Sequence, residues 1–93
     1  MEIRTKSGFE CDIDPKVLRD WRMVHAIKDV YGKTKAEKLQ GMFNMALIVL
    51  GEDGMGRLEN HVADDTGFID SGIMEIEICE IIEKLKESTA KNS

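Results

Sequence analysis

The longest helical pattern in the chain lies between Thr34 and Gly51. Threonine is a preferred N-cap, Glu37 stands where it can complete a capping box, and glycine often ends a helix. Apolar residues recur at spacings of three and four, at Leu39, Met42, Phe43, Ala46, Val49 and Leu50. Leu47 and Ile48 make the last turns apolar on all sides. The pattern predicts a helix in the centre of the fold or in a contact between copies of the chain.

Residues 2–13 alternate between apolar and polar positions, as strands do. One parity carries Ile3, Thr5, Phe9, Cys11 and Ile13. Ser7 and Gly8 lie midway and favour a two-residue hairpin turn. Because two strands alone are barely stable in water, we expect the hairpin to pack on the helices, with Val17 and Trp21 as its contacts.

Two more helices flank the central one in this prediction. Asp14 and Pro15 favour a helix start, and Gly32 favours its end. The apolar stripe of this helix would be Val17, Trp21, Val24, Ile27 and Tyr31. A shorter helix is expected from Glu52 onward, with a stripe of Met55, Leu58 and Val62.

A last helix is predicted over residues 70–87, because the pattern is too long for a typical strand. Its main stripe would be Met74, Ile78, Ile81, Ile82 and Leu85. Ile73 and Ile76 fall beside this stripe and give the helix a second apolar edge. Alternation over residues 74–81 also fits a strand, which stays as the alternative for that segment.

Together these elements predict a mainly α (α+β) fold, in which an N-terminal β-hairpin packs on a bundle of about four helices. Residues 1–88 would form a single helical domain, with the hairpin at about residues 2–13. Residues 89–93 are polar and are expected to form a flexible tail.

Acidic residues outnumber basic residues by 18 to 13, which disfavours nucleic acid as a partner. Apolar runs stay well short of the roughly 20 residues that span a bilayer, so no membrane association is expected. Charged residues follow Met1 at once, unlike in a signal peptide. We therefore expect Cys11 and Cys79 to be free thiols in a reducing cytoplasm, with a disulfide between them as the alternative.

Residues with catalytic or metal-binding chemistry do not form a recognisable motif. His25 and His61 have no partners at the spacing of a metal site or a catalytic triad. Residues 62–73 resemble a calcium loop internally, but Val62 and Ile73 replace its two terminal acidic ligands. The sequence therefore predicts no catalytic residue, no metal and no cofactor.

Several segments, taken in order, resemble the small tail assembly chaperones of long-tailed phages and prophages of Gram-positive bacteria. The resemblance covers nearly the whole chain and rests on an ordered set of short motifs. These are the opening residues 1–14, Leu18-Arg-Asp-Trp21, Leu47-Ile-Val-Leu-Gly-Glu52, Arg57-Leu58 and the ending Lys91-Asn-Ser93. Gly54 and Gly56 depart from the pattern, where stronger helix formers are expected.

The resemblance implies a non-enzymatic protein that binds and solubilises the tape measure protein and helps recruit tail tube protein. Such a chaperone works in the cytoplasm of the bacterial host and is absent from the mature virion. The family often also has a longer form made by translational frameshifting. A small helical adaptor or regulatory protein of a phage or prophage is the alternative function, and it would form a one-to-one complex.

A chaperone of this kind needs more apolar surface than its own core uses. The wide apolar end of the central helix and the second edge of the last helix are candidates for that surface. The predicted partner-binding residues are Leu47, Ile48, Met55, Ile73 and Ile76. Self-association through the same residues is a corollary.

Overall fold

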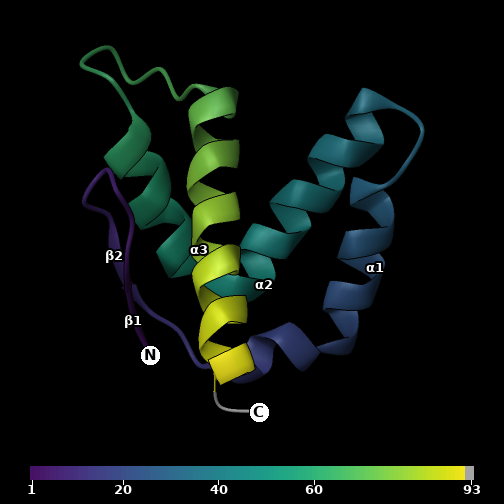
Figure 1. Ribbon diagram of the computed structural model, residues 1–93. Helices are drawn as coiled ribbons and strands as arrows, with labels where there is room; N and C mark the ends of the chain where they lie inside the picture. Colours follow the sequence, from purple (N-terminus) through teal and green to yellow (C-terminus); the bar gives the residue numbers. More distant parts are fainter. Residues whose placement is uncertain (92–93) are drawn as a thin grey trace.

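The computed structural model describes residues 1–91, with the side chains of residues 1–88. Over this range the elements are β1 (Glu2–Arg4), β2 (Glu10–Asp12), the 3₁₀-helix η1 (Pro15–Arg19), α1 (Trp21–Val30), α2 (Lys35–Val62) and α3 (Ser71–Lys91) (Figure 1). The predicted mainly helical fold with an N-terminal hairpin is confirmed. The predicted bundle of about four helices is wrong, because the described residues form three α-helices.

The hairpin buries the face that the alternation predicted. Its two strands are antiparallel, with Ile3 opposite Cys11. The amide of Thr5 donates to the carbonyl of Phe9 over 2.9 Å, so residues 6–8 form a three-residue loop rather than the predicted two-residue turn. Gly8 takes a φ of 93° at the end of this loop, as the corresponding residue of such loops does. The buried side chains are Ile3, Thr5, Phe9, Cys11 and Ile13.

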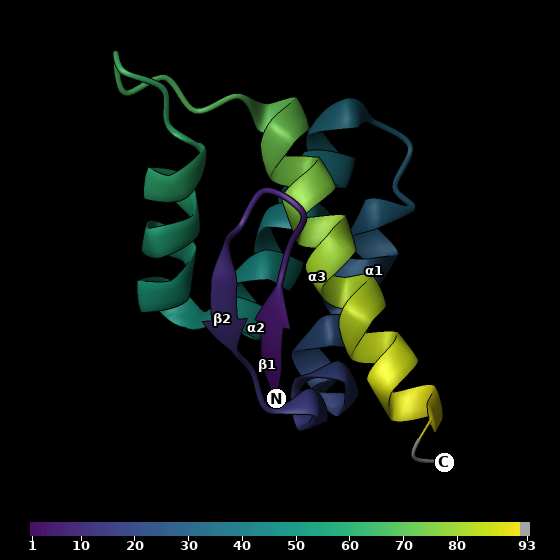
Figure 2. The same cartoon turned by 60° about the vertical axis from the view of Figure 1, so that its left-hand side comes forward.

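The hairpin packs on α3 and on the second half of α2, which lie beside it in Figure 2. The ring of Phe9 lies 5.5 Å from that of His61, and the Arg57 guanidinium lies 5.9 Å from the Phe9 ring centre. The predicted contact with Trp21 is wrong, because Trp21 is 72 % exposed. Val17 is partly buried against the core.

The first predicted helix is broken into two pieces by Asp20. Residues 15–19 wind as a 3₁₀-helix, and Asp20 then takes an extended conformation with a ψ of 131°. The Asp20 carboxylate caps α1 by accepting from the amide of Arg22 over 2.9 Å. Side-chain hydrogen bonds from Arg22 lower the pKa of Asp20 to about 2. Asp20 therefore stays ionised as the cap of α1 near neutral pH.

The buried side of α1 differs from the side that the sequence predicted. Met23 and Ala26 are the buried residues of α1, each 2 % exposed. The 3₁₀-helix and the extended residue separate Val17 from the rest of the predicted stripe. The stripe was wrong within α1 because Ala26 lies on the side where the backbone of α1 meets Gly41 of α2. Four of its five members are exposed instead: Trp21, Val24, Ile27 and Tyr31.

Gly51 kinks α2 into two arms. The hydroxyl of Thr34 caps the start of the helix, as predicted, by accepting from the amide of Glu37 over 3.1 Å. Gly51 has φ 75° and ψ 172°, which is non-helical and is available essentially to glycine alone. We call residues 35–50 the first arm and residues 52–62 the second arm. The helix predicted to start at Glu52 is the second arm of α2.

The stripe predicted for α3 forms the centre of the core. Asp70 accepts from the amide of Ile73 over 2.9 Å at the start of the helix. Buried on its inner face are Ile78, Ile81, Ile82 and Leu85, with Met74 partly buried beside them. A strand over residues 74–81 is excluded. The helix runs on to Lys91, beyond the predicted end at residue 87. A flexible tail over residues 89–93 stays a prediction, and residues 92–93 lie outside the described part of the chain.

Candidate partner-binding groove

A groove of about 580 Å³ lies between the two arms of α2 and the first turns of α3. In Figure 1 the first arm of α2 and the start of α3, which both contribute lining residues, diverge towards the top of the view. Apolar side chains make up most of its wall. The lining residues are Ala36, Leu39, Gln40, Met42, Phe43, Met55, Glu59, Ile69, Ser71, Met74, Glu75 and Ile78.

The apolar wall of the groove stays accessible to solvent. Phe43 is 47 % exposed, and Leu39 and Ile69 are also exposed although they are large apolar residues. Met55 lies at the bottom, where it also belongs to the core. An exposed apolar concavity of this kind is typical of a surface that binds another molecule.

The loop between α2 and α3 holds Ile69 at the edge of the groove. Asp64 organises this loop, because one of its carboxylate oxygens accepts from the amides of Thr66, at 2.8 Å, and Phe68, at 3.0 Å. The same oxygen accepts from the Thr66 hydroxyl over 2.6 Å, and hydrogen bonds from Thr66 lower the pKa of Asp64. The loop therefore has a fixed shape that keeps Phe68 and Ile69 outside the core.

The charged residues that line the groove are acidic. Glu59 comes from the second arm of α2, and Glu75 comes from the first turns of α3. The second arm of α2 and the first half of α3 have the same sign, because residues 52–83 hold ten acidic residues and one basic residue. An apolar wall with carboxylates beside it suits a ligand with both apolar and positively charged groups.

A second apolar surface lies on α1, beside the side that packs on α2, and two of its members line a hollow of about 230 Å³ with side chains of α2 and α3. We call Trp21, Val24, Ile27 and Tyr31 the α1 stripe. Trp21 is 72 % exposed and Tyr31 is 83 % exposed, the highest fractions among the large apolar side chains with described surroundings. The rings of Trp21 and His25 meet edge to face, 5.9 Å apart. The α1 stripe contributes little to the core and is free to contact another molecule.

The five residues predicted from the sequence to bind a partner do not come together. Leu47 and Ile48 are partly buried and line a small hollow between α1 and α2. Met55 is 4 % exposed at the bottom of the groove. Ile73 and Ile76 are exposed on α3 but do not line the groove.

Leu39 and Phe43 are not among the partner-binding residues predicted from the sequence. Both match the helical period of the central stripe, for which the pattern predicts either the centre of the fold or a contact between copies. The kink at Gly51 changes this, because the second arm and α3 cover Ala46 and Val49 and leave the earlier turns exposed. The signal in the sequence was Gly51 itself, which was interpreted as the end of a helix.

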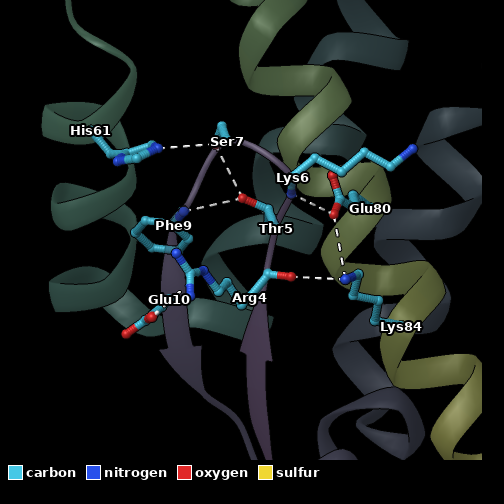
Figure 3. A network of polar contacts seen from close by, with 9 residues as sticks. All are labelled: Arg4, Thr5, Lys6, Ser7, Phe9, Glu10, His61, Glu80 and Lys84. Atoms are coloured by element: carbon cyan, nitrogen blue, oxygen red, sulfur yellow. Dashed lines mark hydrogen bonds and ion pairs between the residues drawn. The ribbon is translucent and has the colours of Figure 1, made fainter.

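A polar network fastens the hairpin loop to the helices (Figure 3). The amide of Lys6 donates to the Glu80 carboxylate over 2.9 Å, and the Lys84 ammonium donates to the carbonyl of Arg4 over 2.8 Å. Lys84 and Glu80 also form an ion pair, with 3.6 Å between nitrogen and oxygen. These contacts join the hairpin to α3.

Ser7 continues this network towards the buried carboxylate of Glu77. Its hydroxyl donates to Glu77, which is 4 % exposed, and also contacts the Nε2 of His61 at 2.9 Å. A hydroxyl has one proton, so while Ser7 donates to Glu77 its contact with His61 requires the tautomer that carries a proton on Nε2. The arrangement joins the hairpin loop to α3 and to the second arm of α2.

Neither a metal cluster nor a membrane helix is found in the described part of the chain. Over residues 1–91, no three or more His, Cys, Asp or Glu side chains are arranged to hold a metal ion. Within the same range, none of the helices combines the length and the apolarity needed to cross a membrane. Comparison of the chain with models of protein families, with curated proteins and with solved structures gave no match.

Proposed function

We propose that this chain is a non-enzymatic assembly chaperone whose groove binds an amphipathic helix of its partner. The observation that carries the proposal is the groove itself, with exposed Leu39, Phe43 and Ile69 beside the carboxylates of Glu59 and Glu75. A helix that lays apolar residues into such a groove removes that surface from water. We call the bound segment of the partner the client helix.

The lining of the groove supports the binding of varied client helices rather than one fixed sequence. Met42, Met55 and Met74 come from both arms of α2 and from α3. Methionine side chains are flexible and polarisable, so they can adapt to apolar residues of different shape. The carboxylates of Glu59 and Glu75 would pair with lysine or arginine on the flank of the client helix and set its orientation.

Within this proposal the partner is taken from the resemblance to tail assembly chaperones. The client helices would be apolar segments of the tape measure protein, which the chain keeps soluble while tail tube protein assembles around it. The setting would be the cytoplasm of the bacterial host, and the chain would leave before the virion is complete. Its acidic surface supports this role, because a high net charge opposes aggregation of the loaded complex.

The test is co-expression with the tape measure protein from the same genome, followed by size exclusion with light scattering. We expect several copies of the chain to co-elute with a tape measure protein that is insoluble alone. Phe43→Glu, which places a charge in the groove, should leave the tape measure protein in the pellet. Ile76→Glu is the matched control, because Ile76 is exposed on α3 outside the groove.

Two outcomes would contradict the proposal. The first is a tape measure protein that stays insoluble with the wild-type chain. The second is equal solubilisation by Phe43→Glu and Ile76→Glu, since the groove would then have no part in binding. A stoichiometry of one to one would instead favour the adaptor alternative. Circular dichroism of each variant shows whether the helices are intact.

A further inference from the structure

The molecule is strongly polarised in charge. Residues 14–38, which contain α1, hold seven basic and four acidic residues, whereas the rest of the chain holds six basic and fourteen. Glu59 and Glu75, the two charged residues that line the groove, belong to the acidic part, whereas the start of the first arm at Ala36 belongs to the basic part. Two copies of the chain can therefore attract each other when the α1 region of one meets the groove region of the other.

The α1 stripe has the properties that the groove requires of a client helix. Trp21, Val24, Ile27 and Tyr31 are spaced along one side of a helix, at intervals of three or four. Lys28 lies next to this side, whereas Arg22 lies on another side and is paired with Asp20. The stripe extends over roughly 15 Å, which is about the length of three helical turns. It is an amphipathic helix that is already folded and exposed, with the cation of Lys28 beside its apolar side.

The stripe cannot reach the groove of its own chain. α1 packs against the first arm of α2 through Met23 and Ala26, and the opposite side of that arm lines the groove with Leu39 and Phe43. In Figure 1 the first arm stands between α1 and the start of α3. An occupant from α1 must therefore come from a second copy.

We propose that the α1 stripe of one copy docks into the groove of a second copy and occupies it until a client helix displaces it. The occupant is a second copy of this chain, and the contact joins two different surfaces, so each dimer keeps one free groove and one free stripe. Such a contact extends into a ring or a filament. Self-association would cover the apolar wall of the groove between synthesis of the chain and arrival of the client.

This proposal rests on the groove of the proposed function, but its test needs no client. Sedimentation velocity of the purified chain should show species larger than the monomer that grow with protein concentration and shrink at high salt. Tyr31→Glu places a negative charge in the α1 stripe, and Phe43→Glu places one in the wall of the groove. Each variant alone should weaken self-association by about tenfold or more and sediment as a monomer.

A mixture of the two variants distinguishes docking of a stripe into a groove from pairing of two stripes. Tyr31→Glu keeps an intact groove and Phe43→Glu keeps an intact stripe, so the mixture should form one-to-one dimers that do not grow further. Ile76→Glu is the control and should associate as the wild type does. The proposal is overturned by a monomeric wild type, by a mixture that stays monomeric, or by self-association of Phe43→Glu alone, as stripe-to-stripe pairing would give.

The same variants separate this proposal from the proposed function. Tyr31→Glu should be monomeric and still solubilise the tape measure protein, because its groove is open. If the mixed variants dimerise but no chain solubilises the tape measure protein, the proposed function fails and the self-docking stands. If the tape measure protein is solubilised but the mixture stays monomeric, the self-docking fails and the proposed function stands.

Discussion

Gly41 on α2 lies directly against the backbone of Ala26 on α1, so that a Cβ atom at position 41 would stand 2.7 Å from the carbonyl oxygen of Ala26. It would also stand 2.5 Å from the backbone nitrogen of Val30. Both helices meet here through backbone atoms with almost no side chain between them. The closeness explains why small Ala26 is inside while the large residues of the α1 stripe are outside.

We predict that Gly41→Ala lowers the free energy of unfolding by about 1–3 kcal/mol, because the added methyl group forces α1 and α2 apart. Urea denaturation followed by circular dichroism measures this change. Gly56→Ala is the control within the same helix, since a Cβ there has no atom within 4 Å. That control should gain roughly 0.5–1 kcal/mol from helix propensity. A loss of similar size in both variants would contradict the close contact.

The sequence predicted those elements that local rules decide. The hairpin face, the Thr34 cap and the buried stripe of α3 all follow from periodicity and capping, and all are confirmed. The buried side of α1 could not be predicted in the same way. An aspartate such as Asp20 can lie inside a helix or cap a new one, and the side that is buried depends on the tertiary contact between Gly41 and Ala26.

The groove could not be predicted for a related reason. Leu39 and Phe43 have the same periodicity as buried Ala46, and the pattern alone does not tell which turns of a long helix are covered. Which turns of the first arm are buried depends on the direction of the second arm after the kink at Gly51, and that direction is set by tertiary contacts. The local sequence does not distinguish a glycine that ends a helix from a glycine that kinks one.

The kink at Gly51 gives a second prediction. Because φ is 75° and ψ is 172°, alanine at this position should cost about 1–3 kcal/mol of stability or drive α2 towards a straight helix. A straight helix would separate the two arms that line the groove, and in that case Gly51→Ala should also weaken self-association in sedimentation velocity. Glu52→Ala, an exposed neighbour, is the control and should change neither property. Unchanged stability and association in Gly51→Ala would show that the kink is not needed.

The contact between Ser7 and Glu77 gives a third prediction. Glu77 is buried, and among the described side chains its second carboxylate oxygen has no hydrogen-bond partner. Ser7→Ala removes the donor to the first oxygen, so we expect a loss of about 1–3 kcal/mol in urea denaturation at pH 7. The double variant Ser7→Ala with Glu77→Met should recover most of this loss, because both polar partners are then gone. A double variant as unstable as Ser7→Ala alone would argue against this contact.

The two thiols give a fourth prediction, because they differ in exposure. Both cysteines are free, with Cys11 buried in the hairpin face and Cys79 exposed on α3. Burial raises the pKa of each thiol, and the carboxylates of Glu75 and Glu83 raise that of Cys79 further. Since the thiolate is the reactive form, a raised pKa slows reaction at neutral pH and makes the rate climb as the pH rises towards the thiol pKa.

Titration of the native chain with a chromogenic disulfide reagent tests this difference. One thiol should react in the folded protein, at a rate below that of free cysteine, and the second should react only after denaturant is added. Cys79→Ser should abolish the first phase and leave the second, whereas Cys11→Ser should do the opposite. Two thiols that react together in the native chain would show that the hairpin opens faster than the reagent attacks, and that the contacts of Ser7, Lys6 and Arg4 with the helices do not hold it closed.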